Sequence, residues 1–224
     1  MAINPKKLAG DYAASFVRDG MLVGLGTGST AYWAIEKIGE MVGHSGLRIR
    51  AVSSSKKSEE QARSLKIPIV SFSDTDLIDI TIDGADEVDP DKNLIKGGGG
   101  ALLREKIVAF NSRKLIIIVD DSKLVKQLGR FPVPVETAIF GWERTKENLA
   151  GLGCQPNLRM SDIGPFITDN GNYIIDCSFR KIEDPELLQQ KINLIPGVLE
   201  NGLFIHLASM VIVGHQDGRV KQID

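Results

Sequence analysis

The stretch DGADEVDPDKNLIKGGGGALLREK, residues 83–106, constrains the fold of this 224-residue chain more than any other. The apolar run LIDITID at 77–83 predicts a buried strand, and the apolar spacing of 101–110 predicts a helix. Four glycines, 97–100, lead directly into that helix. Bare glycine backbone can approach a ligand closely, and a helix N-terminus offers free N–H groups to an anion. We therefore predict an α/β fold whose parallel sheet carries an anion-binding loop at its carboxyl edge.

Charged side chains are concentrated in the same stretch. Asp83 and Asp86 follow the predicted strand, Lys96 precedes the glycines, and Glu105 falls in the second turn of the predicted helix. Taken singly, these residues are ordinary turn carboxylates and solvated helix charges. Four successive glycines, however, cost backbone entropy unless the conformation requires them. Their combination with these charges favours a functional site.

A second glycine-rich loop, GLGTGST, occupies residues 24–30 between a predicted strand, MLVGL, and a predicted helix. This arrangement is typical of phosphate binding by backbone N–H groups. Thr27, Ser29 and Thr30 would add hydroxyl donors to such a site. The alternative is that Ser29 or Thr30 only caps the helix.

The same loop also fits a dinucleotide-binding pattern. Gly26, Gly28 and Ala31 match Gly-x-Gly-x-x-Ala, which is too short to be specific. The next predicted strand ends in Ser53–Ser55 instead of the acidic residue that holds an adenosine ribose. The sequence therefore favours a terminal phosphate over a dinucleotide.

Strands and helices alternate through the first half of the chain. Residues 5–19 and 56–67 predict helices, whereas 47–52 and 68–72 predict strands. KLIIIVD at 114–120 is typical of a parallel strand covered on both faces. The pattern predicts a Rossmann-like open, mostly parallel sheet with helices on both faces.

The pattern changes at Phe131, where the predicted order becomes strand, helix, strand, strand, helix, strand. This is the order of a split βαβ, ferredoxin-like sandwich. FPVPVE at 131–136 is predicted to be an edge strand because of its prolines, and Asp169–Gly171 to be a hairpin turn. SMVIVG and VKQID predict a return to the first sheet. The predicted domains are a Rossmann-like catalytic domain at 1–128 and 204–224 and an inserted α+β domain at 129–203.

Composition argues against several classes of function. A net charge of −2 argues against a nucleic-acid surface but permits a small phosphorylated substrate, which needs only local positive charge. The N-terminal residues lack the apolar core of a signal peptide, and no run approaches the roughly 20 apolar residues of a membrane span. We therefore predict a cytoplasmic protein with neither nucleic-acid nor membrane partners.

Residues typical of metal or nucleophilic chemistry are scattered. Cys154 and Cys177 lie far apart in the sequence, which predicts reduced, structural thiols. His44, His206 and His215 lie outside the glycine-rich motifs, and no pair has metal-ligand spacing. No Gly-x-Ser-x-Gly motif indicates a hydrolase. We predict neither a metal site nor a cofactor.

GLGTGST, DGADE and KGGGGALLREK resemble, in order, the three signature stretches of the A-type ribose-5-phosphate isomerase family. VSSS, FPVPVE, TDNGNYIID and NLIPGVLENGLF extend the similarity over nearly the whole chain. The resemblance implies interconversion of D-ribose 5-phosphate and D-ribulose 5-phosphate through an enediolate, in the non-oxidative pentose phosphate pathway. It also implies a homodimer, with a tetramer as the alternative, that needs no cofactor.

The resemblance further implies roles for single residues. Glu105 is the expected general base, and Asp83 and Asp86 are expected to open the sugar ring and hold its hydroxyls. Lys96 is the expected partner of the enediolate. These roles agree with the residues themselves, because carboxylates, a lysine and backbone donors suit proton transfer next to a carbonyl.

For the phosphate, the resemblance points to Ser29, Thr30 and Lys123, with Lys6 as a weaker candidate. A lysine just beyond a strand end, as Lys123 is, would otherwise be read as solvated. The expected substrate contacts are Thr27, Gly28, Ser29, Thr30, Asp83, Gly84, Ala85, Asp86, Lys96, Gly97, Gly98, Gly99 and Lys123.

Two alternatives come from other classes of protein. A sugar-phosphate-binding sensor or regulatory domain of the same fold should carry an N-terminal helix-turn-helix, whereas the first predicted strand begins at Met21. A nicotinamide-dependent dehydrogenase is disfavoured by Ser53–Ser55. Both remain less favoured than the isomerase.

Overall fold

The computed structural model describes residues 3–74 and 77–224. The chain divides into two compact units, and each has its own sheets. Unit 2 contains residues 86–103, 124–128 and 204–206 in addition to 129–203, the range predicted as an inserted domain. The predicted domain boundaries remain a prediction. Unit 1 comprises Met1–Ala85, Arg104–Lys123 and Leu207–Asp224, and unit 2 comprises Asp86–Leu103 and Leu124–His206.

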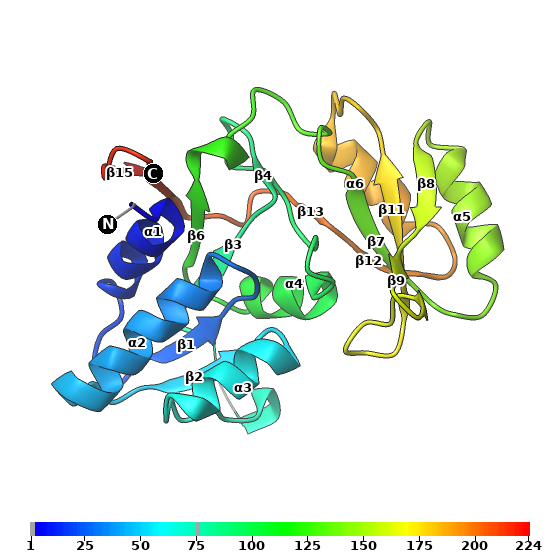
Figure 1. Cartoon of the computed structure of the whole chain (residues 1–224). Helices are drawn as coiled ribbons and strands as arrows, with labels where there is room; N and C mark the ends of the chain where they lie inside the picture. Colours follow the sequence, from blue (N-terminus) through cyan, green and yellow to red (C-terminus); the bar gives the residue numbers. More distant parts are fainter. Residues whose placement is uncertain (1–2, 75–76) are drawn as a thin grey trace. The chain divides into compact units, whose positions relative to one another are not determined.

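Unit 1 is built on a six-stranded sheet with the strand order β15-β14-β6-β3-β1-β2 (Figure 1). All its pairings are parallel except that of β14 with β15, which confirms the predicted Rossmann-like sheet. The run LIIIVD is buried at every position, as expected of a strand covered on both faces. The strands are β1 (Leu22–Leu25), β2 (Arg50–Ser53), β3 (Ile80–Gly84), β6 (Leu115–Asp120), β14 (Met210–Gly214) and β15 (Val220–Ile223).

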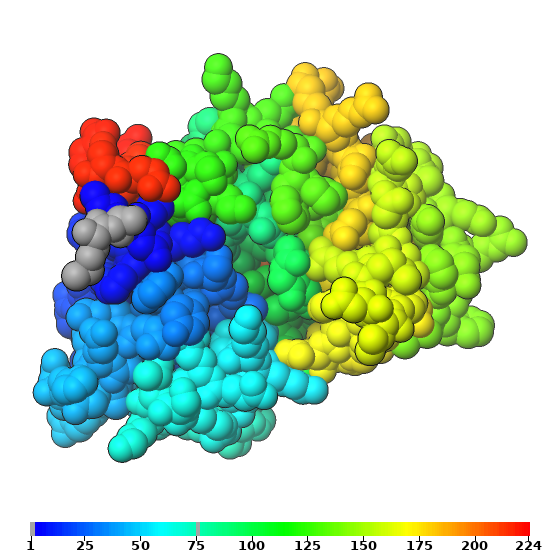
Figure 2. All heavy atoms as spheres, viewed as in Figure 1, coloured from blue at the N-terminus to red at the C-terminus, as the bar shows by residue number. Residues whose placement is uncertain are grey.

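Helices cover both faces of this sheet, as predicted. Side chains alternate along β1, so that Val23 and Leu25 pack with α1 and α2, whereas Leu22 packs with Val108 of α4. Burying each such side chain contributes roughly 1.5–3 kcal/mol. The C-terminal segment, red in Figure 2, lies against the blue α1. The helices are α1 (Pro5–Ala14), α2 (Ala31–Ser45), α3 (Lys56–Ser64) and α4 (Leu102–Phe110).

Local capping explains where α1 begins and ends. The Asn4 side chain accepts hydrogen bonds from the N–H groups of Lys6 and Lys7, and Pro5 occupies the first turn. The helix ends at Ala14 and not at the predicted residue 19. The N–H groups of the next three residues donate to carbonyls three positions back, which is a tighter turn than an α-helix.

Unit 2 contains an antiparallel sheet with the order β12-β7-β11-β8, the strand order of the predicted ferredoxin-like sandwich (Figure 1). Val133 and Val135 of β7 share one core with Leu149 of α5 and Ile192 of α6. The elements of this sandwich are β7 (Val133–Thr137), α5 (Trp142–Ala150), β8 (Gln155–Leu158), β11 (Tyr173–Ser178), α6 (Pro185–Asn193) and β12 (Val198–Asn201). Two smaller sheets consist of β4 (Glu87–Val88), β5 (Leu94–Ile95) and β13 (Leu203–Phe204), and of β9 (Met160–Ser161) and β10 (Gly164–Pro165).

The edge position predicted for FPVPVE is wrong, because β7 pairs with strands on both sides. Proline lacks the N–H that a central strand normally donates. At Pro134, the ring faces Gly202 just beyond the end of β12, and an added Cβ on Gly202 would lie 2.6 Å from Cδ of Pro134. The missing side chain leaves room for the ring. The Pro134 carbonyl still accepts the Gly202 N–H at 2.7 Å.

Two further predictions are corrected. Residues 68–72 form no strand, since Ile69 makes only an isolated bridge with Ala51 and Phe72–Asp74 form a 3₁₀ turn. Asp169–Gly171 do lie in a turn, closed by the Thr168 N–H and the Asn172 carbonyl at 2.9 Å. The strand after this turn pairs with β7 and β8, so the turn does not join a hairpin of two paired strands.

The two cysteines meet in the core of unit 2, where both are free thiols. The hydrogen bond from Cys177 lowers the pKa of the Cys154 thiol, and the same contact together with burial raises the pKa of Cys177.

Over residues 3–74 and 77–224, no helix combines the length and apolarity needed to cross a membrane.

Candidate active site

The loop after β1 and the end of β3 meet at the carboxyl edge of the unit 1 sheet. The two strands are parallel neighbours, with Leu25 opposite Ile82. The Thr27 N–H donates to Oδ1 of Asp83 at 2.9 Å, and the Gly84 N–H donates to the same oxygen at 2.7 Å. Asp83 is only 1% exposed. An added Cβ on Gly26 would overlap this carboxylate, so the approach requires glycine.

The hydroxyls predicted to bind phosphate lie at the start of α2. Oγ of Ser29 accepts a hydrogen bond from Nζ of Lys6 at 2.9 Å, which brings a cation to the loop. Thr30 occupies the N-cap position, yet its side chain makes no capping hydrogen bond. The alternative that Thr30 serves as a side-chain cap is therefore wrong.

The side-chain hydroxyl of Thr27 lies among three serine hydroxyls. Its Oγ1 lies 2.8 Å from Oγ of Ser54, 2.9 Å from Oγ of Ser55 and 3.2 Å from Oγ of Ser58. The hydroxyl of Ser58 in turn donates to the Gly26 carbonyl at 2.6 Å. These buried hydroxyls fix the conformation of the loop. Sequence reasoning missed this role, although the serine run after β2 was its visible signal.

The remaining predicted residues of unit 1 lie at or just beyond the ends of β3 and β6, and in α4. Gly84 ends β3 and Ala85 follows it. The 3₁₀ turn Asp121–Lys123 places a half-buried Lys123 beyond the carboxyl end of β6, which is the parallel neighbour of β3. Glu105 is 4% exposed and lies in the first turn of α4, not the second, because the helix begins at Leu102.

Unit 2 holds the other predicted groups. The Gly98 N–H donates to Oδ2 of Asp86 at 2.8 Å, so the structure brings these two predicted residues together. Lys96 is 2% exposed, and its Nζ lies 5.3 Å from the centroid of the Phe204 ring. A cation over an aromatic face is electrostatically favourable.

Not every N–H group of the Gly97–Gly100 loop is available to a ligand. The Gly98 N–H is engaged by Asp86, and the Gly100 N–H donates to the Gly97 carbonyl at 3.0 Å. Gly98 and Gly99 are the exposed part of the loop. The N–H group of Gly98 therefore binds the carboxylate of Asp86, and the N–H group of Gly99 is the one in this loop best suited to bind a ligand.

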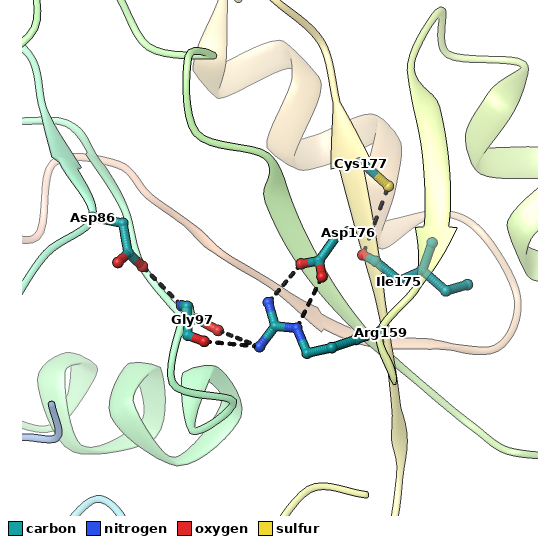
Figure 3. Close-up of polar contacts among 7 residues, drawn as sticks. Asp86, Gly97, Arg159, Ile175, Asp176 and Cys177 are labelled. Carbon is teal, nitrogen blue, oxygen red and sulfur yellow. Dashed lines mark hydrogen bonds and ion pairs between the residues drawn. The ribbon is translucent and has the colours of Figure 1, made fainter. Parts of the chain in front are cut away.

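Sequence reasoning also missed Arg159 and Asp176. Nη1 of Arg159 donates to the carbonyls of Gly97 and Gly98 at 3.0 and 3.1 Å, and its other nitrogens bind Asp176 (Figure 3). Arg159 lies 62 positions from Gly97, and nothing in the residues around either position announces the contact.

Unit 1 thus offers a phosphate-type loop with a buried carboxylate at the same sheet edge, and unit 2 offers a carboxylate, a buried lysine and an amide loop. Such groups can bind a phosphorylated ligand, transfer protons and stabilise an oxyanion. Within the described ranges 3–74 and 77–224, no group of three or more His, Cys, Asp or Glu side chains is arranged to hold a metal ion.

Comparison with known sequences agrees with this chemistry. The model of the family described as ribose 5-phosphate isomerase A (phosphoriboisomerase A) matches residues 50–218. The ribose-5-phosphate isomerase A of Bacillus mycoides is 55% identical over 217 residues, which cover 96% of this chain and 98% of that protein. The corresponding protein of Listeria monocytogenes serovar 1/2a is 49% identical over 222 residues, which cover 99% of each.

Comparison with solved structures gives the same family. A D-ribose-5-phosphate isomerase in complex with phospho-erythronic acid superimposes with a TM-score of 0.96 at 42% identity, covering 99% of this chain and 100% of the other. The ribose 5-phosphate isomerase A of Methanocaldococcus jannaschii gives a TM-score of 0.93 at 41% identity, covering 98% and 97%.

Proposed function

The chain belongs to the ribose 5-phosphate isomerase A family and interconverts D-ribose 5-phosphate and D-ribulose 5-phosphate, and on this premise we propose that the reaction passes through an enediolate held by the predicted site residues. The observation that carries the proposal is the hydrogen bond between the Thr27 amide and Asp83. It joins a phosphate-type loop to a buried carboxylate. The reaction belongs to the pentose phosphate pathway.

The substrate phosphate binds at the loop after β1. The loop amides, together with the hydroxyls of Ser29 and Thr30, donate to its oxygens, as at other strand–loop–helix phosphate sites. Lys6, already within hydrogen-bonding distance of Ser29, adds positive charge, and Lys123 acts from the end of β6. These contacts hold one end of the sugar while the other end reacts.

Proton transfer is assigned to the carboxylates. Asp83 and Asp86 open the sugar ring and hold its hydroxyls, and Glu105 removes the proton from C2 of the open-chain aldose. The electron pair of that C–H bond forms the C1–C2 double bond of an enediolate. Return of the proton to C1 and transfer of a proton between the two oxygens then give the ketose. Shielding Glu105 from water suits it to accept a carbon-bound proton, and its side chain is buried.

Stabilisation of the enediolate is assigned to Lys96 and the N–H groups of the Gly97–Gly100 loop. Negative charge develops on oxygen between the two proton transfers, and preorganised donors lower the barrier to forming it. We propose that phospho-erythronic acid, which one solved relative holds, also binds here. Its carboxylate spreads negative charge over two oxygens, as the enediolate does. The positive charge of Lys96 serves in place of a cofactor, so none is proposed.

Weakening the phosphate site tests this proposal. In Ser29→Ala and Lys123→Ala, we expect the KM for ribose 5-phosphate to rise about 10- to 100-fold, because each loses one contact to a charged group. Turnover should stay within about threefold of the parent, because such contacts are made equally in the ground and transition states. The assay is the appearance of ribulose 5-phosphate on mixing purified protein with ribose 5-phosphate.

Lys114→Ala is the matched control, because Lys114 is an exposed lysine at the opposite end of β6. Its KM should match that of the parent. A thousandfold loss of kcat with unchanged KM in Lys123→Ala would place this lysine in the chemistry and not in the phosphate site. If the parent protein forms no ribulose 5-phosphate, the premise on which the proposal rests is wrong.

We further propose that the enzyme is a cytoplasmic homodimer, or a tetramer built from such dimers. Unit 2 exposes the large apolar side chains of Phe140, Ile163 and Leu194, and β8 and β12 are the edges of its four-stranded sheet. Sedimentation at micromolar concentration should therefore give a mass of at least twice 24.4 kDa. A single species at the monomer mass would overturn the proposal.

A further inference from the structure

We propose that Arg159, held by Asp176, is a positioning residue that orients the peptide groups of the glycine loop for catalysis. It need not touch the substrate. It acts through the carbonyls of Gly97 and Gly98, and the inference rests on the proposed role of the loop amides in stabilising the enediolate.

Asp176 and the backbone hold the Arg159 guanidinium in place. Arg159 lies between β8 and β9, where its N–H donates to the Ile174 carbonyl at 2.8 Å and its carbonyl accepts the Phe166 N–H at 2.9 Å. Its Nε and Nη2 bind the two carboxylate oxygens of Asp176 at 2.9 and 2.5 Å. The pair is largely buried, with side-chain exposures of 14% for the arginine and 23% for the aspartate. This bidentate geometry leaves Nη1 directed at the loop (Figure 3).

The sheet explains why these side chains meet. Asn157 pairs with Asp176 across β8 and β11, so Arg159, two residues further on, projects from the same face, diagonal to Asp176. This is the face opposite the helices, because Cys177 and Ile175 point into the core that contains α5 and α6. The polar pair therefore lies on the face without helices, where Nη1 of Arg159 meets the carbonyls of Gly97 and Gly98.

The contact decides which way two peptide groups point. In a trans peptide, the carbonyl and the following N–H lie on opposite sides. Because Nη1 of Arg159 holds the carbonyls of Gly97 and Gly98, the N–H groups of Gly98 and Gly99 are directed away from it. The first of them meets Oδ2 of Asp86 at 2.8 Å. The second, from Gly99, therefore points toward the side on which Asp86 lies. Successive N–H groups on one side of the chain form a concave anion site.

The Gly98–Gly99 peptide depends most on the Arg159 contact for its orientation, because the Gly97–Gly98 peptide is also held by Asp86. Peptide groups flanked by residues without Cβ can rotate with little steric resistance. A rotated peptide would present its carbonyl oxygen to the enediolate in place of an N–H, which replaces attraction by repulsion. Loss of the hydrogen bonds from Arg159 to the loop carbonyls should therefore raise the barrier of the chemical step and leave the phosphate contacts unchanged.

Arg159→Lys tests this inference, because lysine keeps the charge but cannot bridge a carboxylate and two carbonyls with one ammonium group. We expect kcat to fall about 10- to 100-fold, somewhat less than the loss of a whole oxyanion donor, because rotated peptides would still return at times to the productive orientation. The KM for ribose 5-phosphate and the inhibition constant of inorganic phosphate should stay within about twofold, whereas phospho-erythronic acid should bind more weakly in parallel with kcat/KM. Arg144→Lys, at an exposed ion pair on α5, is the matched control and should retain the parent values.

Asp176→Asn provides a second test, which is sufficient by itself if Arg159→Lys does not fold. Asp176→Asn should lower kcat by a smaller factor than Arg159→Lys does. In the double variant, kcat should fall by less than the product of the two single factors. Unchanged kcat in folded Arg159→Lys or Asp176→Asn would overturn the inference, as would a loss confined to thermal stability. Gly99→Pro, which removes the N–H, separates the premise from the inference. If this variant keeps full turnover, the proposed role of the amide is wrong, whereas if it loses turnover and Arg159→Lys does not, only the role of Arg159 is wrong.

Discussion

Replacing Glu105 by glutamine is expected to lower kcat by about 10²–10⁴, which is the contribution typical of a positioned general base. Glutamine matches glutamate in size and has a similar helix propensity, so α4 should still form. The KM for ribose 5-phosphate should change little, because the proposed phosphate contacts belong to other residues. A steady-state assay of ribulose 5-phosphate formation, with circular dichroism as a check of folding, measures both effects.

Hydrogen exchange separates this role from a merely electrostatic one. Folded Glu105→Gln should fail to exchange the C2 hydrogen of ribose 5-phosphate with deuterated solvent, as followed by proton NMR. Glu60→Gln, which removes an exposed charge from α3 in the same unit, should exchange at the parent rate. Exchange at the parent rate in Glu105→Gln would mean that another carboxylate removes the proton, with Asp83 as the first suspect, and that Glu105 is only a helix charge.

Replacing Lys96 by methionine should lower kcat by about 10²–10³, the effect typical of losing one stabilising donor at a developing oxyanion. Methionine is unbranched and similar in length, so it can occupy the buried position beside the Phe204 ring. Ribose 5-phosphate should still bind through its phosphate. Initial-rate kinetics over a range of substrate concentrations would separate the loss of kcat from any change in KM.

Two further measurements decide what Lys96 does. The affinity for phospho-erythronic acid should fall in step with kcat/KM, because an intermediate mimic depends on the same charge, while inhibition by inorganic phosphate should persist. Lys126→Met, at an exposed lysine of unit 2, controls for loss of positive charge. If Lys96→Met is folded and turns over like the parent, the enediolate is stabilised by other groups, and the amide of Gly99 becomes the main candidate.

Much of the fold could be predicted because its signals are local. The buried run of β6, the glycine loop before α2 and the proline at the start of α1 each act on residues adjacent in the chain. The order of strands and helices followed from such signals, and with it the parallel sheet of unit 1 and the antiparallel sandwich of unit 2. Thr27 and Asp83 were both predicted at the carboxyl edge of the sheet, but that they meet depends on β1 and β3 being neighbouring strands, which the structure shows.

The errors came where pairing partners decide. The prolines of 131–136 indicated an edge strand, but whether a missing N–H is tolerated depends on the residue opposite, and Gly202 supplies the space. The strand expected at 68–72 is reduced to a single bridge between Ile69 and Ala51 of β2. Local periodicity reports how residues alternate along a segment and carries no information about what lies beside that segment.

The sequence by itself therefore determined the order of the elements, the two glycine-rich loops and the identity of the carboxylates and lysine beside them. Only the tertiary structure decided how those loops are held. The hydroxyl of Thr27 contacts serines that follow β2, and Arg159 donates a hydrogen bond to the carbonyl of Gly97, 62 positions away. Such contacts depend on the register of strands and the direction of side chains across a finished sheet. These arise from packing between distant segments, so no pattern within either segment could reveal them.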